Sequence, residues 1–192
     1  MSVDTQDAGA ARPTNIRFAY LKWGFLALLQ LALISIPLVD RLDVQMTGTV
    51  VPLELVPVDP RDILRGDYVI INLAIGRIPR TMDGAESLKA GQTVFVELET
   101  DGEGAARPVS ISSSHQQSGN LAIAGAVRST SAETVWIDYG IDAFFLPEGE
   151  GLEIERLDTN RVLLEVAIAE DGRSLPLNLL VDGKVFKSDG SF

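Results

Sequence analysis

The sequence predicts a mainly β, β-rich α+β protein in which an N-terminal transmembrane helix precedes one β-sandwich or small-barrel domain. Three observations predict this fold class. They are an uncharged apolar run near the N-terminus, short segments of alternating hydrophobicity after it, and turn residues between those segments. The chain has 192 residues, of which 46% are hydrophobic, so it is long and apolar enough to bury one core.

The apolar run extends from Phe18 to Val39, and its 17 residues from Trp23 onward carry no charge. As a helix it measures about 33 Å, which is enough for a hydrocarbon core of about 30 Å. It is longer than the apolar region of a signal peptide and lacks a small-residue cleavage site after it. It also lacks the polar stripe of a buried core helix. We therefore expect a tail over 1–17, a retained anchor over 18–39 and an exported domain over 40–192.

Charges flanking the anchor predict its orientation. Arg12, Arg17 and Lys22 precede or open the helix, whereas only Arg41 follows it closely. The positive-inside rule then places the N-terminus in the cytoplasm and 40–192 outside. The exported part holds 13 basic and 25 acidic residues, a net charge of −12. This acidity argues against nucleic acid as a partner, and the bilayer itself is the expected partner of the anchor.

Alternating hydrophobicity predicts the strands, with Val94, Val96 and Leu98 sharing an inward face. We expect strands at Val44 to Leu55, Asp67 to Ile75, Thr93 to Glu99, Val109 to Ile111, Leu121 to Val127, Thr134 to Tyr139, Val162 to Ile168, Leu175 to Val181 and Val185 to Phe186. Asp171-Gly172 predicts a two-residue hairpin turn with Gly172 at positive φ, and Asp182-Gly183 predicts a second turn. The helical expectations are Glu148 to Leu157 and Gly84 to Leu88.

Composition excludes several chemistries. The chain has no cysteine and a single histidine, His115, so we expect no thiol catalysis, no multi-histidine zinc site and no cofactor. Ser113 and His115 would share a face of an extended segment, but the polar residues after them favour a solvated loop over a catalytic pair. A cluster of four glutamates favours an acidic helix start over a calcium loop. Its members are Glu148, Glu150, Glu153 and Glu155.

The densest polar constellation precedes the expected strand at Asp67. Asp67 falls on the same face as apolar residues, so we expect it to point inward and to pair with Arg61 or Arg65. A structural ion-pair motif is one interpretation, and a binding site for a polar ligand or partner is the other. The residues are Asp59, Arg61, Asp62, Arg65, Gly66, Asp67 and Tyr68.

This constellation resembles the signature of the GDYXXLXY family of bacterial membrane-anchored proteins. Gly66, Asp67 and Tyr68 match the signature, whereas Ile71 and Leu73 replace its later Leu and Tyr. A second block, 139–149, is similar to the family's segment that ends in Pro-Glu-Gly, which here is Pro147, Glu148 and Gly149. The resemblance implies a membrane-anchored protein that is often encoded with, or fused to, polytopic membrane proteins. We therefore expect a location in the bacterial inner membrane with the C-terminal domain in the periplasm. The resemblance brings no established activity.

Two functions follow as hypotheses. The first is a non-enzymatic, membrane-anchored accessory domain that binds an integral membrane protein. The second is an envelope hydrolase, because Arg65, Gly66 and Asp67 are also similar to a strand of type I signal peptidases. Those enzymes need a serine soon after the anchor, and 40–65 contains none. The first hypothesis is therefore preferred, and no catalytic residue is assigned.

Overall fold

The computed structural model describes residues 16–56, 68–70, 72–100, 104–115, 120–141, 143–145, 157 and 161–188. The chain divides into two compact units, Met1–Asp40 and Arg41–Phe192, and we call the second the β-domain. The elements are α1 (Ile16–Thr47), β1 (Thr49–Val56), β2 (Tyr68–Ile70), β3 (Asn72–Leu73), the short 3-10 helix η1 (Ala74–Gly76), β4 (Arg77–Pro79), β5 (Thr93–Glu99), β6 (Arg107–Ser112), β7 (Leu121–Thr130), β8 (Thr134–Asp138), β9 (Ala143–Phe145), β10 (Val162–Ile168), β11 (Ser174–Val181) and β12 (Lys184–Ser188).

The helix α1 is longer than the apolar run. From Tyr20 to Thr47 it is long and apolar enough to cross a membrane, by length and composition. Nearly all of its side chains from Tyr20 to Val39 are exposed. The expectation that a strand starts at Val44 is wrong, because α1 continues to Thr47 and β1 starts at Thr49. The side chain of Val44 is buried against β10 and β11, and this packing outweighs its β-propensity.

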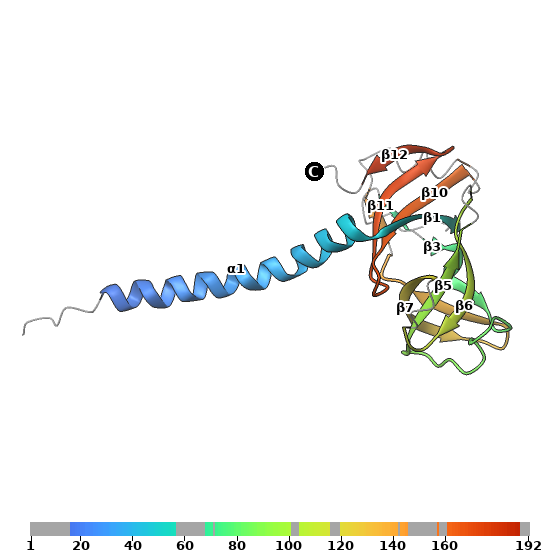
Figure 1. The fold of residues 1–192 in the computed structure, drawn as a ribbon, viewed down its shortest axis with the longest axis horizontal. Helices are drawn as coiled ribbons and strands as arrows, with labels where there is room; N and C mark the ends of the chain where they lie inside the picture. The colour runs from blue at the N-terminus through green and yellow to red at the C-terminus, as the bar shows by residue number, and fades with distance from the viewer. Residues whose placement is uncertain are drawn as a thin grey trace, which may run out of the picture. The chain divides into compact units, whose positions relative to one another are not determined.

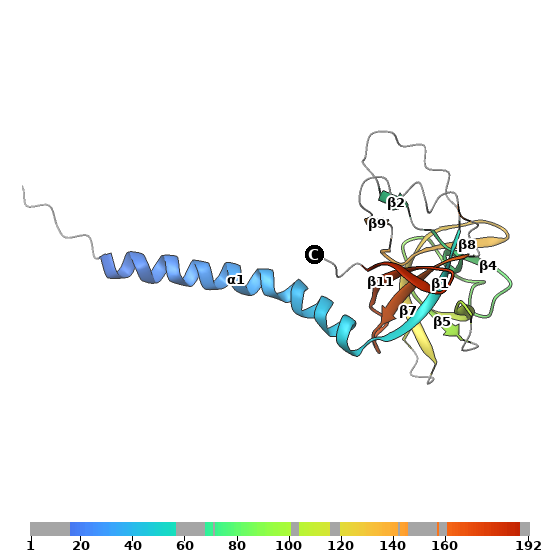
Figure 2. The same cartoon turned by 90° about the horizontal axis from the view of Figure 1, so that it is seen from above.

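Two five-stranded antiparallel sheets form the body of the β-domain. Their strand orders are β12-β11-β10-β1-β3 and β4-β8-β7-β5-β6. In Figure 1, β10, β11 and β12 lie together, and β5, β6 and β7 form part of the other sheet. Figure 2 shows the remaining pair, β2 and β9, side by side. The mainly β prediction and the N-terminal apolar helix are confirmed.

Both sheets contribute to one hydrophobic core, as a sandwich requires. The predicted alternation is confirmed in β5, and in β10 it holds from Val162 to Val166, after which Ala167 and Ile168 are both buried. Pro52 has no backbone N–H to donate, and it lies in the part of β1 that pairs with β10 and not in the part that pairs with β3. Its carbonyl accepts a hydrogen bond from the Ala106 N–H at 2.7 Å. The largest fully buried side chains are Leu53, Ile78, Ile123, Leu164, Ile168 and Leu179.

Two local expectations fail for the same reason, which is that short apolar runs do not distinguish strand, turn and helix. Gly84 to Leu88 forms turns rather than a helix, although Ala85 and Leu88 are buried. The expected strand from Asp67 to Ile75 breaks up into β2, β3 and η1, and η1 turns the chain toward β4. The helix expected at Glu148 to Leu157 lies outside the described residues, except for a bend at Leu157.

The two Asp-Gly hairpins differ. After β10, the Ala169 N–H donates to the Arg173 carbonyl and the Gly172 N–H donates to the Ala169 carbonyl. These bonds enclose a three-residue loop, so the predicted two-residue turn is wrong, while the positive φ of Gly172 is confirmed at +89°. Asp182 and Gly183 form the two-residue primed turn instead, with φ values of +51° and +73°.

Candidate functional site

Most of the sequence-predicted site residues lie outside the described part of the chain. These are Asp59, Arg61, Asp62, Arg65, Gly66, Asp67, Pro147, Glu148 and Gly149. The backbone of Tyr68 is described and begins β2. The inward orientation of Asp67 and its pairing with an arginine therefore stay predictions.

The structure brings together the two segments on which the family resemblance rests. Strand β2 pairs antiparallel with β9, so that Tyr68 lies opposite Phe145 and Ile70 lies opposite Ala143. The two segments are far apart in the sequence, and the sequence did not predict β9 as a strand. This backbone pairing makes the surroundings of β2 and β9 the natural place to look for a site.

A groove of about 210 Å³ adjoins this pair along the chain. Asn72 and Leu73 lie just after β2, and Ile141 lies just before β9. Side chains from β4, β7 and β8 complete the lining. The described lining residues are Asn72, Leu73, Gly76, Arg77, Arg128, Trp136, Ile137, Asp138, Tyr139 and Ile141.

Two arginines and one carboxylate set the charge of the groove. The Arg128 guanidinium donates to Asp138, with 3.0 Å between Nη2 and Oδ2. The other oxygen of Asp138 accepts the Gly140 N–H at 2.9 Å, so this carboxylate is held from both sides. Arg77 is exposed and lies directly opposite Trp136 in the β4–β8 register. The groove can therefore offer guanidinium donors and an indole surface to a ligand.

Tyr139 is one of the residues that line the groove. Its hydroxyl donates to the Ile75 carbonyl at 2.9 Å. Burial raises the pKa of Tyr139, so the phenol stays protonated and remains a donor. Gly125 leaves room for the ring, because a Cβ there would lie 2.9 Å from Tyr139 Cδ1. The bond ties η1 to the segment after β8.

Tyr139→Phe is expected to lower the free energy of unfolding of the β-domain by about 1–2 kcal/mol, because the Ile75 carbonyl loses its donor. Denaturant unfolding of the full-length protein in detergent, followed by tryptophan fluorescence, measures the change. Tyr20→Phe is the matched control, since Tyr20 is 73% exposed on α1. Equal stability of the two variants would show that the bond contributes nothing.

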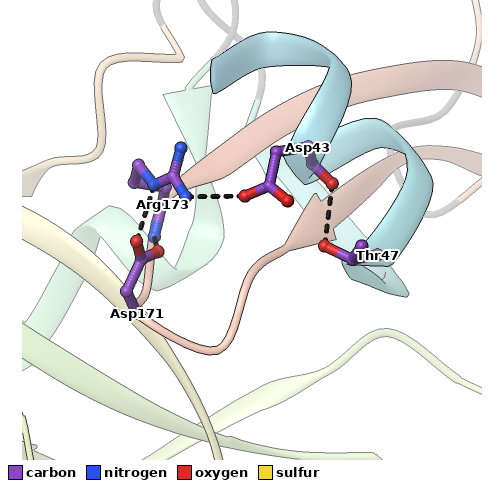
Figure 3. A network of polar contacts seen from close by, with 4 residues as sticks. All are labelled: Asp43, Thr47, Asp171 and Arg173. Atoms are coloured by element: carbon purple, nitrogen blue, oxygen red, sulfur yellow. Dashed lines mark hydrogen bonds and ion pairs between the residues drawn. The ribbon is translucent and has the colours of Figure 1, made fainter. Parts of the chain in front are cut away.

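A second polar cluster joins the end of α1 to the hairpin after β10. Figure 3 shows Arg173 between Asp43 and Asp171, with distances of 2.8 Å from Nη2 to Asp43 Oδ2 and 2.7 Å from Nε to Asp171 Oδ2. Partial burial raises the pKa of Asp171, but hydrogen bonds from the backbone N–H and guanidinium of Arg173 outweigh it and hold that pKa below its ordinary value. The stabilisation of the native state by the ionised Asp171 carboxylate is present near neutral pH and is lost as the pH falls through the pKa of folded Asp171.

Apolar packing and a close backbone approach complete this junction. Val44 is 4% exposed and packs with Ala167, Ala169 and residues of β11. A Cβ at Gly48 would lie 3.1 Å from Ala167 Cβ and 2.5 Å from the Val44 carbonyl oxygen. Glycine therefore lets the chain leave α1 and enter β1 directly against β10. The last residues of α1 are part of the β-domain packing.

A family model described as GDYXXLXY protein matches residues 30–179. The chain belongs to the GDYXXLXY family. This match covers most of the chain and confirms the resemblance to the family that the sequence motifs indicated. No curated protein and no solved structure is similar enough to count as a match.

The matched range of this GDYXXLXY protein starts inside α1 and ends within β11. It therefore includes the junction at Val44 and the whole described lining of the groove. Both features belong to the family region and not to an appended segment.

The Ser-His segment of the GDYXXLXY protein forms the end of β6 and the residues after it. The His115 ring lies against Phe95, with 5.1 Å between centroids and a tilted geometry. Ser112 and Ser114 bond to each other through the Ser112 hydroxyl. In the described region, no hydrogen bond joins Ser113 to His115. This geometry gives the Ser-His interpretation no support.

Sequence reasoning missed the groove residues of the GDYXXLXY protein. Arg77, Arg128 and Trp136 lie on three different strands, and only the register of those strands brings them together. One signal was present. In the expected strand from Thr134, the polar or amphipathic residues Thr134, Trp136 and Asp138 alternate with buried ones, which predicts an outer face that carries a tryptophan.

Proposed function

We propose that this GDYXXLXY protein is a single-pass protein of the bacterial inner membrane, with its N-terminus in the cytoplasm and its β-domain in the periplasm. Its role is that of a non-enzymatic accessory protein that binds an integral membrane protein. Family membership and the apolar helix α1 support the location. The basic residues before α1 support the orientation.

The packed end of α1 is the observation that supports the accessory role. The helix is unbroken from Ile16 to Thr47, and Val44 is buried in the β-domain. A domain that follows a membrane anchor in the same chain stays near the membrane that holds the anchor. It then meets proteins of the same membrane at high effective concentration. A partner in that membrane is the simplest use of such a connection.

A topology test addresses the orientation. A reporter that is active only outside the cytoplasm, fused after Phe192, should be active. A reporter that is active only in the cytoplasm should be silent at the same position. The reverse pattern would overturn the proposed orientation.

A capture experiment addresses the partner. Full-length protein, purified from detergent-solubilised membranes after crosslinking, should retain one defined integral membrane protein. Val44→Asp should lose it, because a carboxylate cannot stay packed among the apolar residues that surround Val44. Met46→Asp is the matched control, since Met46 is 82% exposed in the same helical turn. Failure of the wild type to retain any integral membrane protein, or loss of the partner from both variants alike, would contradict the proposal.

A further inference from the structure

We propose that the groove lined by Arg77, Arg128 and Trp136 binds one acidic side chain of the membrane partner, presented on an extended segment. This inference rests on the proposed function, because it names the contact through which the partner is held. The charge of the groove and the strand geometry around it support this inference.

The charge of the groove is opposite in sign to the net charge of the chain from Asp40 onward. The chain from Asp40 onward has a net charge of −12, whereas the groove presents two guanidinium groups against the single carboxylate of Asp138. Arg128 uses one nitrogen on Asp138, and a guanidinium has five N–H donors in all. Arg77 makes no ion pair within the described part of the chain. Donors for a second carboxylate are therefore present.

The strand geometry directs both arginines to the groove. The β7–β8 register shifts between Val127 and Ser129, so Arg128 is the extra residue of a β-bulge. Bulges redirect a side chain and are frequent beside functional sites. Arg77 begins β4, the edge strand of its sheet, directly opposite Trp136. Arginine at such a position can bind a carboxylate with two hydrogen bonds while an aromatic face shields it from water.

The groove by itself is smaller than most small-molecule sites. Its volume of about 210 Å³ is below the range of about 300–1,000 Å³ that is usual for small-molecule sites. A second hollow of about 570 Å³ shares Arg77 and Trp136 with the groove and is also lined by Pro79, Thr134 and the carboxylate-bearing Glu133. The main chain that bears the acidic residue can lie there. Pro79 has no N–H to donate to a partner strand, so at this position the edge strand offers only a carbonyl acceptor.

The acidic remainder of the domain limits what the groove accepts. A polyanion such as nucleic acid or an anionic membrane surface would be repelled by the net negative charge of the domain. A single carboxylate on an otherwise neutral segment avoids this repulsion. The preferred ligand is therefore one Asp or Glu side chain with uncharged neighbours.

Charge reversal at the groove tests the inference. Full-length Arg77→Glu, purified from crosslinked, detergent-solubilised membranes, should retain at least about 30-fold less of the partner than the wild type, as is typical when one member of a buried interfacial charge pair is lost. Arg77→Lys should retain an intermediate amount, because it keeps the charge but not the bidentate geometry. Arg107→Glu is the matched control: Arg107 is also exposed, and it begins β6, the opposite edge of the same sheet.

The outcomes separate the two proposals. If the wild type retains no integral membrane protein, the accessory role itself fails. If the wild type and Arg77→Glu retain the same amount of partner, the role stands and the groove is not the contact. Equal losses in Arg77→Glu and Arg107→Glu would indicate a general charge effect and would also overturn the inference. Unchanged thermal unfolding of Arg77→Glu excludes misfolding as the cause, as expected for an exposed residue.

Discussion

Gly172→Val is expected to lower the free energy of unfolding of the β-domain by about 3–5 kcal/mol. Gly172 has a φ of +89°, which a β-branched residue tolerates poorly. A Cβ there would also lie 3.1 Å from Ala124 Cβ and 3.2 Å from Phe95 Cδ1, and the Gly172 carbonyl accepts the Ala124 N–H at 2.9 Å. The hairpin of one sheet thus packs on the other sheet at this residue. Denaturant unfolding of the full-length protein in detergent measures the loss.

Gly183→Val separates backbone strain from packing. Gly183 has a φ of +73° in the next hairpin, but a Cβ there would meet nothing within 4 Å. The free energy of unfolding of this variant should fall only by the strain of a left-handed backbone conformation, about 1–3 kcal/mol. If Gly172→Val were no more destabilising than Gly183→Val, the contact between the hairpin and β5 and β7 would not contribute to stability.

Gly84→Ala should be about 3 kcal/mol less stable than the wild type, even though only one methyl group is added. Gly84 has a φ of +82°, and its Cβ would lie 1.8 Å from the Ile111 carbonyl oxygen. That oxygen belongs to β6, whose Ile111 N–H donates to the Asp83 carbonyl at 3.0 Å. The turn must therefore move away from β6 and break this bond. Thermal unfolding measures the loss of stability, and faster hydrogen exchange of the Ile111 N–H reports the loss of its bond to Asp83.

Gly91→Ala is the control for this change. Gly91 has nearly the same φ, +83°, but a Cβ there would have open space around it. We expect a cost of about 1–2 kcal/mol, which is the ordinary cost of a left-handed conformation for alanine. A Gly84→Ala protein as stable as Gly91→Ala would mean that the turn is not held against β6.

The sequence predicts those elements whose own pattern is strong. The alternation in β5 and β10 and the apolar helix are local properties, and the structure has them. Elements that depend on distant contacts were missed or misjudged. β4 and β9 have three residues each and are strands only because β8 and β2 pair with them. The extension of α1 past Val44 depends on packing against β10 and β11.

The same contrast between local sequence patterns and distant contacts applies to the candidate site. A signature such as Gly66-Asp67-Tyr68 is contiguous, so the sequence alone indicates it. The groove needs the register of β4, β7 and β8 together with the bulge at Arg128, and no local pattern contains that information. The loop length after β10 is a similar case, because an Asp-Gly pair allows both a two-residue and a three-residue hairpin.

The pairing of β1 with β10 has a consequence for the synthesis of the protein. The first strand after α1 lies between β10 and β3, and Thr49 pairs with Ile168. Nearly the whole chain must therefore leave the ribosome before β1 finds its main partner and before Val44 is covered. Contacts of such long sequence separation form late and slowly. Until then the apolar residues of β1 stay exposed, and this interval is when the nascent chain is most open to chaperones and proteases.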